Sequence, residues 1–282
     1  MSVDILQEKI RKTKNPLILY LQALPQYLPE AFMQEELSSA YQSYFEGLLE
    51  KLKDSVPAVR FGFGSFALMG EAGFRLLSRL MTLSQELGYY VLMDLPELMT
   101  PLAASNALQQ LDDYSLDGVI VSCYLGSDVF LPLQKLCQKS KTVFAVCRTS
   151  NKSAVEVQDL LTGGRHVHTA VADIVSRCAE PVVARCGYSQ MGILAAASTS
   201  QGLSTLRSKF SKLFLILDGA DYPNANAKNC SNAFDRLGHG AVACVGESVV
   251  AAWKEGEGEP HEMALQAALR HKKNLTRYIT IL

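Results

Sequence analysis

The sequence predicts a single (β/α)8 TIM barrel, and two observations favour this fold. Eight short apolar segments alternate with stretches of helical periodicity along the 282 residues, which is the order of parallel strands joined by crossover helices. The chain also lacks a Gly-rich or Ser-rich linker between its halves. Barrels of this type often run to 250 residues or more as one unit, so we expect one domain over residues 1–282.

The expected strands follow one another at intervals long enough for a helix. Each is short and apolar, as strands buried on both faces of a parallel sheet are. Spacing of i, i+3 and i+4 among the apolar residues of 74–83 and 129–137 predicts helices that cover the barrel. The strands are expected at 17–21, 58–63, 89–95, 118–124, 142–147, 181–186, 213–217 and 240–245.

The two ends of the chain are expected to be helical. The first helix covers residues 1–15, and the last covers 261–274 after a polar Gly-Glu-Gly-Glu-Pro loop at 256–260. The final segment, 278–282, is apolar and has no obvious partner in a monomeric barrel. We expect it to pack against a second subunit.

Composition excludes several classes of function. The net charge is −1 with scattered basic residues, and no run of 18 apolar residues occurs, so we expect neither nucleic acid nor a membrane as a partner. The seven cysteines are an odd number, which predicts free thiols in a reducing, cytoplasmic setting. No CxxC or HExxH spacing appears, and His166 and His168 lack a third ligand, so we expect no metal and no cofactor.

Barrel enzymes carry their chemistry at the carboxyl ends of the strands. Asp94 closes the third expected strand, Asp218 and Asp221 follow the seventh, and Glu247 follows the eighth. These four carboxylates could form an acidic mouth. Such a mouth could bind a cation or a cationic substrate, although solvated loop carboxylates are the commoner outcome.

Several of the same segments resemble the orotidine 5′-monophosphate decarboxylase family, in its longer bacterial branch. The similarity keeps the same order from about residue 10 to about residue 270. The matching stretches are Asn-Pro-Leu at 15–17, Val-Pro-Ala-Val-Arg-Phe at 56–61, 70–74, Tyr-Leu-Gly-Ser-Asp at 124–128, Cys-Arg-Thr-Ser-Asn at 147–151, Gln-Asp-Leu at 158–160, and Gly-His-Gly-Ala at 238–241.

The resemblance implies an aspartate and lysine network across strands two and three, and this chain departs from it. Asp94 is retained, but Arg60 replaces the lysine of strand two, and the catalytic lysine and second aspartate fall on Pro96 and Met99. The family's reaction develops a carbanion, which needs a lysine to stabilise and protonate it. A guanidinium is a very poor acid, and a carboxylate at Glu97 has the wrong charge.

The resemblance also implies a phosphate site after strands seven and eight. There, Asp221 replaces the family's glutamine and Glu247 replaces its arginine. Thr149, Ser150 and Asn151 keep the family pattern near the pyrimidine ring. Two interpretations of this segment stay open: a site for a base-sized ligand, or a structural role in which Asn151 caps the following helix and Arg148 forms an ion pair.

We therefore expect a protein linked by descent to pyrimidine biosynthesis that has lost catalysis and acts as a non-catalytic paralogue or binding protein. Its expected partner is a second copy or an intact paralogue, because the family is dimeric; its small-molecule ligand is unknown. Two alternatives stay open. One is an active decarboxylase with Asp94, Arg60 and Glu97 rearranged, and the other is a different lyase or isomerase using the acidic mouth.

Overall fold

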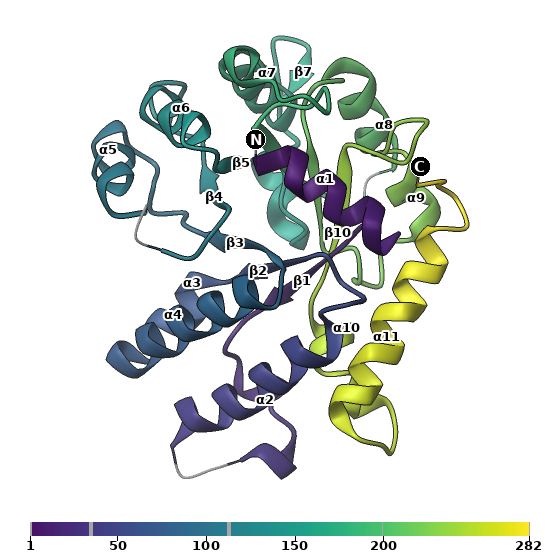
Figure 1. Cartoon of the computed structure of the whole chain (residues 1–282). Coiled ribbons are helices and arrows are strands. Elements are labelled where there is room, and N and C mark those ends of the chain that lie inside the picture. Colours follow the sequence, from purple (N-terminus) through teal and green to yellow (C-terminus); the bar gives the residue numbers. More distant parts are fainter. Residues whose placement is uncertain (1, 34–35, 112–113, 199, 282) are drawn as a thin grey trace.

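Eight parallel strands form a closed barrel, so the predicted (β/α)8 fold is confirmed (Figure 1). The computed structural model describes residues 2–33, 36–111, 114–198 and 200–281. Around the barrel the strands follow the order β1-β10-β9-β8-β5-β4-β3-β2. They are β1 (Leu17–Leu21), β2 (Ala58–Phe61), β3 (Tyr90–Asp94), β4 (Gly118–Ser122), β5 (Thr142–Val146), β8 (Met191–Ala196), β9 (Leu215–Asp218) and β10 (Ala241–Val245).

Helices lie between the strands and surround the barrel (Figure 1). A two-stranded antiparallel hairpin of β6 (Leu161–Thr162) and β7 (Arg165–His166) is added after β5. The helices are α1 (Ser2–Thr13), α2 (Leu37–Leu52), α3 (Phe63–Ala67), α4 (Gly70–Glu86), α5 (Pro101–Gln110), α6 (Phe130–Gln138), α7 (Val167–Ala179), α8 (Ser200–Lys209), α9 (Ala227–Ser231), α10 (Glu247–Val250) and α11 (Pro260–Leu275).

The sixth barrel strand is not where the sequence predicts it. Residues 181–186 were expected to form it, but Pro181 lies in a 3-10 turn, Glu180–Val182, and Val183 forms only an isolated antiparallel bridge with Ser189. Proline has no N–H to give to a ladder, so it disfavours a central strand. The strand is β8, whose Met-Gly-Ile-Leu-Ala-Ala sequence contains one glycine and two alanines, residues with low strand propensity.

Helix α1 closes the amino-terminal end of the barrel and crosses in front of the strands in Figure 1. Val3, Leu6 and Ile10 belong to the same buried cluster as the inward-facing residues of the strands. The Ser2 amide donates to Gln190 Oε1 at 2.7 Å, and Ser2 Oγ lies 2.7 Å from the Tyr90 hydroxyl. The opposite end, where the strands finish, is therefore the end at which ligands could enter.

The carboxyl-terminal segment packs on its own barrel, which corrects the expectation that 278–282 needs a second subunit. Ile279 packs against the outer core and Ile281 against the inner cluster. A Cβ on Gly238 would lie only 2.2 Å from the Thr280 carbonyl oxygen, so this glycine lets the tail approach closely. Leu282 lies outside the described residues.

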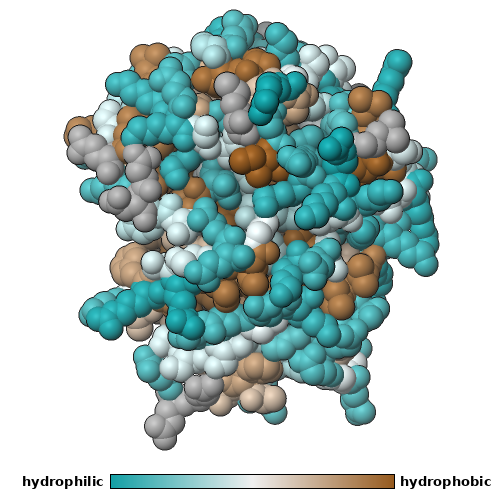
Figure 2. All heavy atoms as spheres, in the orientation of Figure 1, coloured by the Kyte–Doolittle hydropathy of each residue, from teal (hydrophilic) through white to brown (hydrophobic). Residues whose placement is uncertain are grey.

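The face shown in Figure 2 is mostly hydrophilic, with hydrophobic residues scattered among the hydrophilic ones. A groove of about 880 Å³ runs between α4 and α5 and is lined by apolar residues that include Phe74, Met93 and Leu98.

All seven cysteines are free thiols. Across the described ranges, no helix is long and apolar enough to cross a membrane.

Candidate functional site

Arg60 occupies the centre of the barrel near its carboxyl end. Alternation along β2 turns Val59 outward and Arg60 inward, where only 6% of Arg60 is exposed. Its Nε donates to Asp94 Oδ1 at 2.7 Å and its Nη2 to Asp94 Oδ2 at 2.9 Å. Its Nη1 donates to Asp218 Oδ1 at 2.8 Å. One guanidinium therefore neutralises the carboxylates that end β3 and β9.

Two further inward-facing side chains complete this cluster. The Tyr20 hydroxyl donates to Asp94 Oδ2 at 3.0 Å, and the Arg60 guanidinium carbon lies 4.1 Å from the centre of the Tyr20 ring. Arg60 Nη1 also lies 3.6 Å from Cys244 Sγ. Aromatic stacking and bidentate carboxylate pairing both suit a planar guanidinium better than a lysine.

The cluster is electrostatically fixed rather than poised to transfer protons. Burial works against the charge of Arg60, but Asp94 and the other negative partners outweigh it and hold the Arg60 pKa well above its usual value. Burial raises the pKa of Tyr20 and raises the pKa of the Cys244 thiol to about 12. These three groups keep their protons at neutral pH, so none of them is an effective acid or nucleophile there.

The four carboxylates considered for an acidic mouth have separate partners. Asp94 and Asp218 are paired with Arg60. Asp221 Oδ2 accepts from the backbone amides of Gly246 at 2.9 Å and Ser248 at 3.2 Å. Glu247 has 59% of its side chain exposed and lies 3.8 Å from Lys254. Within the described part of the chain, no group of three His, Cys, Asp or Glu side chains could hold a metal ion.

Three side chains of the loop after β3 are exposed to solvent. Pro96, Glu97 and Met99 are all exposed, and Met99 has 40% of its surface accessible. Among the described residues, no hydrogen bond or ion pair joins Glu97 to Arg60 or Asp94. The arrangement in which Glu97 combines with Asp94 and Arg60 is therefore not observed.

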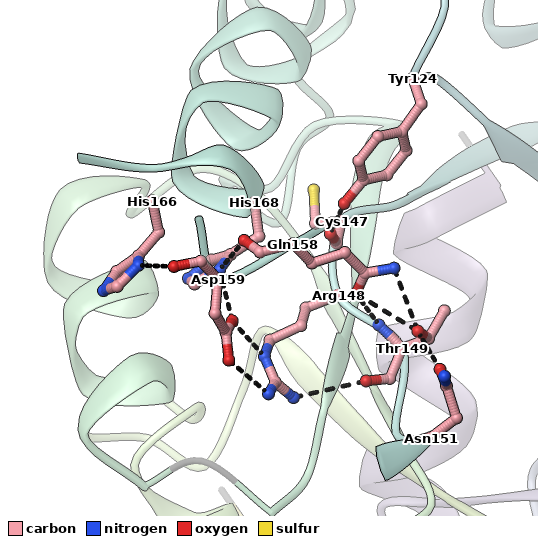
Figure 3. Close-up of polar contacts among 9 residues, drawn as sticks. All are labelled: Tyr124, Cys147, Arg148, Thr149, Asn151, Gln158, Asp159, His166 and His168. Atoms are coloured by element: carbon pink, nitrogen blue, oxygen red, sulfur yellow. Dashed lines mark hydrogen bonds and ion pairs between the residues drawn. The ribbon is translucent and has the colours of Figure 1, made fainter. Parts of the chain in front are cut away.

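A second polar network lies at the end of β5 (Figure 3). Arg148 Nε and Nη2 each donate to one oxygen of Asp159 at 2.8 Å, which is the expected ion pair. The Thr149 amide donates to Gln158 Oε1 at 2.8 Å. Asn151 makes no capping bond with its side chain, which instead accepts from Thr149 Oγ at 2.5 Å. The expected cap is wrong because Thr149 competes for the same oxygen.

The same network fixes the β6–β7 hairpin. His166 Nδ1 lies 2.7 Å from the Asp159 carbonyl oxygen, and His168 Nδ1 lies 3.2 Å from Asp159 Oδ1. The two imidazole rings are stacked, with their centres 5.2 Å apart. The hydrogen bond from Arg148 lowers the pKa of Asp159, and burial lowers the pKa of His168. Figure 3 shows Asp159 between the arginine and the two histidines.

Ser150 connects the two networks. Its hydroxyl lies 2.6 Å from the Asp218 carbonyl oxygen and 2.8 Å from Asp218 Oδ2. Its neighbour Thr149 belongs to the network at the end of β5. The segment 148–151 therefore has structural partners on both sides, although its amino-acid sequence resembles the family segment that lies near the pyrimidine ring.

Three polar side chains were missed by the sequence reasoning. Tyr20 and Cys244 could have been found, because each falls two positions from an inward-facing residue of its strand. The third is His271, whose Nε2 lies 2.7 Å from Ser248 Oγ. No motif marks it, because its partner is 23 residues away.

No model of a known protein family matches the chain. Orotidine 5′-phosphate decarboxylase from Clostridium novyi is 25% identical over 284 residues, which cover 98% of each chain. Orotidine 5′-phosphate decarboxylase from Rhodopirellula baltica is 24% identical over 249 residues, covering 84% of this chain and 82% of its own length. Thirty-one curated proteins match the chain with statistical significance.

The chain is homologous to orotidine 5′-phosphate decarboxylases. The predicted resemblance is thereby confirmed over almost the whole length. The solved structures agree in fold. The Leishmania donovani OMP decarboxylase has a TM-score of 0.73 at 20% identity, and the Plasmodium berghei orotidine 5′-monophosphate decarboxylase has 0.79 at 11%; each covers 98% of both chains.

Proposed function

We propose that this barrel is a catalytically lapsed relative of orotidine 5′-phosphate decarboxylase that acts as a non-catalytic binding protein linked to pyrimidine biosynthesis. One observation carries the proposal: the cation between Asp94 and Asp218 is an arginine that uses Nε, Nη1 and Nη2 to hold both carboxylates. A decarboxylase of this family needs a lysine that can deliver a proton to the carbanion.

The ionisation of Arg60 supports the proposed loss of catalysis. Its pKa is held well above the usual guanidinium value by Asp94 and its other negative partners, against the effect of burial. A general acid works best with a pKa near the operating pH. The positions that resemble the family's catalytic lysine and second aspartate, Pro96 and Met99, are exposed and have no ionisable group.

The loops after β9 and β10 support the proposed loss of the phosphate-binding site. In barrels of this type a phosphate commonly binds after strands seven and eight, against a short extra helix. Here the Asp221 carboxylate already accepts from the amides of Gly246 and Ser248, at the start of α10. A dianion near Asp221 or Glu247 would meet a like charge, which costs about 4 kcal/mol at 4 Å and a dielectric constant of 20.

We also propose that the chain forms a dimer through the carboxyl end of the barrel, with a second copy or an intact paralogue. Exposed hydrophobic side chains gather in the segments that follow β2 to β5. They are Leu68, Met99, Leu102, Leu125, Val155, Val157, Leu160 and Leu161, with exposed fractions from 40% to 91%. Such a concentration is typical of an interaction surface.

The test is a decarboxylation assay on orotidine 5′-phosphate, with the Clostridium novyi relative as the positive control. We expect no product above the uncatalysed background. The melting temperature is measured in parallel with uridine 5′-monophosphate, because a ligand at 100 times its Kd stabilises a protein by about 2.7 kcal/mol. We expect no shift. Turnover would overturn the proposed lapse, and a shift without turnover would show that the nucleotide site persists.

A further inference from the structure

We propose that a cavity between α9, α11 and the outer wall of the barrel binds a small organic anion with a flat apolar body. The cavity has a volume of about 550 Å³, within the range of about 300–1,000 Å³ that is typical of small-molecule sites. It lies on the outside of β1 and β10, so it is separate from the cluster around Arg60. The proposal goes beyond the proposed function and does not depend on it.

The floor of the cavity is apolar. Leu17 and Ala243 contribute outward-facing side chains of β1 and β10, and Leu275 contributes from α11. Alanines at 220, 225 and 227 line the side formed by the β9 loop and α9. Because these side chains are short, they leave a recess that an apolar ring could fill. Displacing water from such a surface favours binding by roughly 25 cal/mol per Å² of buried apolar area.

Two cationic side chains line the cavity. Lys228 lies on α9 and Arg277 follows α11, and both line the cavity. Among the described residues, neither has a carboxylate within ion-pairing distance, whereas many other surface cations do. An anionic group held between α9 and α11 would satisfy both charges.

The one carboxylate in the wall is already engaged. Asp221 also lines the cavity, and its Oδ2 accepts from the amides of Gly246 and Ser248. His271 lines the same wall, and its ring is positioned by Ser248 at 2.7 Å. Burial lowers the pKa of His271 in spite of the opposing effect of Asp221, so the ring is neutral at neutral pH. The lining therefore carries two cations, Lys228 and Arg277, against the single carboxylate of Asp221, so the net charge that faces a ligand is positive.

Charge also separates this cavity from the larger groove between α4 and α5. That groove carries Arg75 and Arg79 in its wall, but they are paired with Glu71 and Glu46. The groove thus offers apolar surface with its cations neutralised. It serves as an internal control, because an anion has no reason to prefer it.

The probe is 8-anilinonaphthalene-1-sulfonate, and N-phenyl-1-naphthylamine is the neutral probe with the same rings. Binding to the full chain is followed by fluorescence and by titration calorimetry. We expect the sulfonate to bind at one site and the neutral probe to bind at least about tenfold more weakly, because the neutral probe cannot form charge-assisted hydrogen bonds with Lys228 and Arg277. Equal affinities would overturn the proposal.

Three variants locate the site. The double variant Lys228→Glu with Arg277→Glu is expected to weaken sulfonate binding about tenfold or more; both residues are exposed, so the fold should survive. Ala227→Phe fills the recess without changing charge and should also prevent binding. Arg75→Glu, in the control groove, should leave the affinity unchanged. Unaltered binding in the first two variants, or loss in the third, would contradict the assignment.

Discussion

Arg60 is the residue that holds two carboxylates inside the barrel, so its removal should leave both without a partner. We predict that Arg60→Met destabilises the protein by about 3–5 kcal/mol, the usual cost of breaking a buried ion pair from one side. Methionine keeps much of the apolar stem and removes the charge that faces Asp94 and Asp218. Urea denaturation followed by circular dichroism measures the change in the free energy of unfolding.

The matched control is Arg75→Met, on the surface of α4. The Arg75 side chain is 79% exposed and pairs with an equally exposed Glu71. We expect a change within about 0.5 kcal/mol. If the two variants lost similar amounts of stability, hydration or protonation of Asp94 and Asp218 would have to compensate for the missing charge of Arg60. The cluster would then be more open to solvent than its burial implies.

Gly192 is a residue whose lack of a side chain allows the barrel to close. A Cβ there would lie 2.4 Å from the Phe214 carbonyl oxygen and 2.6 Å from the Phe144 ring. We predict that Gly192→Ala costs about 1–3 kcal/mol, as overpacking of a core does. The measurement is again the free energy of unfolding in urea.

Gly64 provides the comparison, because a Cβ at this position meets no atom within 4 Å. It lies inside α3 (Phe63–Ala67), where glycine is less favourable than alanine by about 0.5–1 kcal/mol. Gly64→Ala should therefore leave stability unchanged or raise it. If Gly192→Ala stabilised the protein, β8 and β9 would be able to move apart more easily than their hydrogen-bond ladder indicates.

At the scale of elements, the β6–β7 hairpin depends on Asp159. The hydrogen bond from Arg148 lowers the pKa of this carboxylate. A carboxylate with a lowered pKa stabilises the fold above its unfolded pKa, and the stabilisation is lost as the pH falls through the folded pKa. Burial lowers the pKa of His168, and that contribution is likewise present above the unfolded pKa of about 6.5 and decreases below it.

We therefore predict that the melting temperature of the unaltered protein falls as the pH decreases from 7 to 3. The melting temperature of the Asp159→Asn variant should fall less steeply over the pH range in which carboxylates titrate. The variant should already be less stable at pH 7, because an amide cannot replace the paired charge of Arg148. Melting curves at half-unit pH steps test this. Glu71→Gln, at a fully solvated pair, should keep the slope of the unaltered protein. A parallel slope for Asp159→Asn would exclude the proposed coupling.

The elements also show where sequence patterns are sufficient and where they fail. Seven strands were predicted because each is a compact apolar run. Their carboxyl ends placed Asp94 and Asp218 at the same end of the barrel, but the arginine that pairs with both carboxylates was not predicted as a partner of Asp218. β8 was missed because Gly192 is required for the close approach of Phe144 and the Phe214 carbonyl oxygen, whereas glycine and alanine have low strand propensity. Composition alone does not reveal such a tertiary cause.

The partners of loop side chains were harder to predict than the strands. Asp221 was a candidate for an acidic mouth, yet it accepts from amides 25 and 27 residues further along the chain. Ser150 was a candidate ligand contact, yet its hydroxyl meets Asp218, 68 residues away. The positions of these donors depend on loop backbone that no local pattern determines.

At the scale of the whole molecule, the two ends of the barrel differ in how they are covered. α1 seals the amino end with Val3, Leu6 and Ile10. The segments at the carboxyl end leave hydrophobic side chains in water, among them Leu125 at 63% and Leu161 at 71% exposure. This asymmetry argues that the carboxyl end is covered by another chain, as in the proposed dimer.

We predict that sedimentation velocity at micromolar concentration detects a dimer, and that Leu125→Glu with Leu161→Glu shifts it to a monomer of about the same melting temperature. Placing carboxylates in an apolar interface leaves buried charges unpaired, which opposes association without affecting the core. Leu237→Glu is the matched control: Leu237 is 48% exposed and precedes β10, at the opposite end of the barrel, so the dimer should persist. A dimer that survives the double variant but not Leu237→Glu would move the interface to the sealed end, and the exposed carboxyl rim would then need a partner other than a second copy.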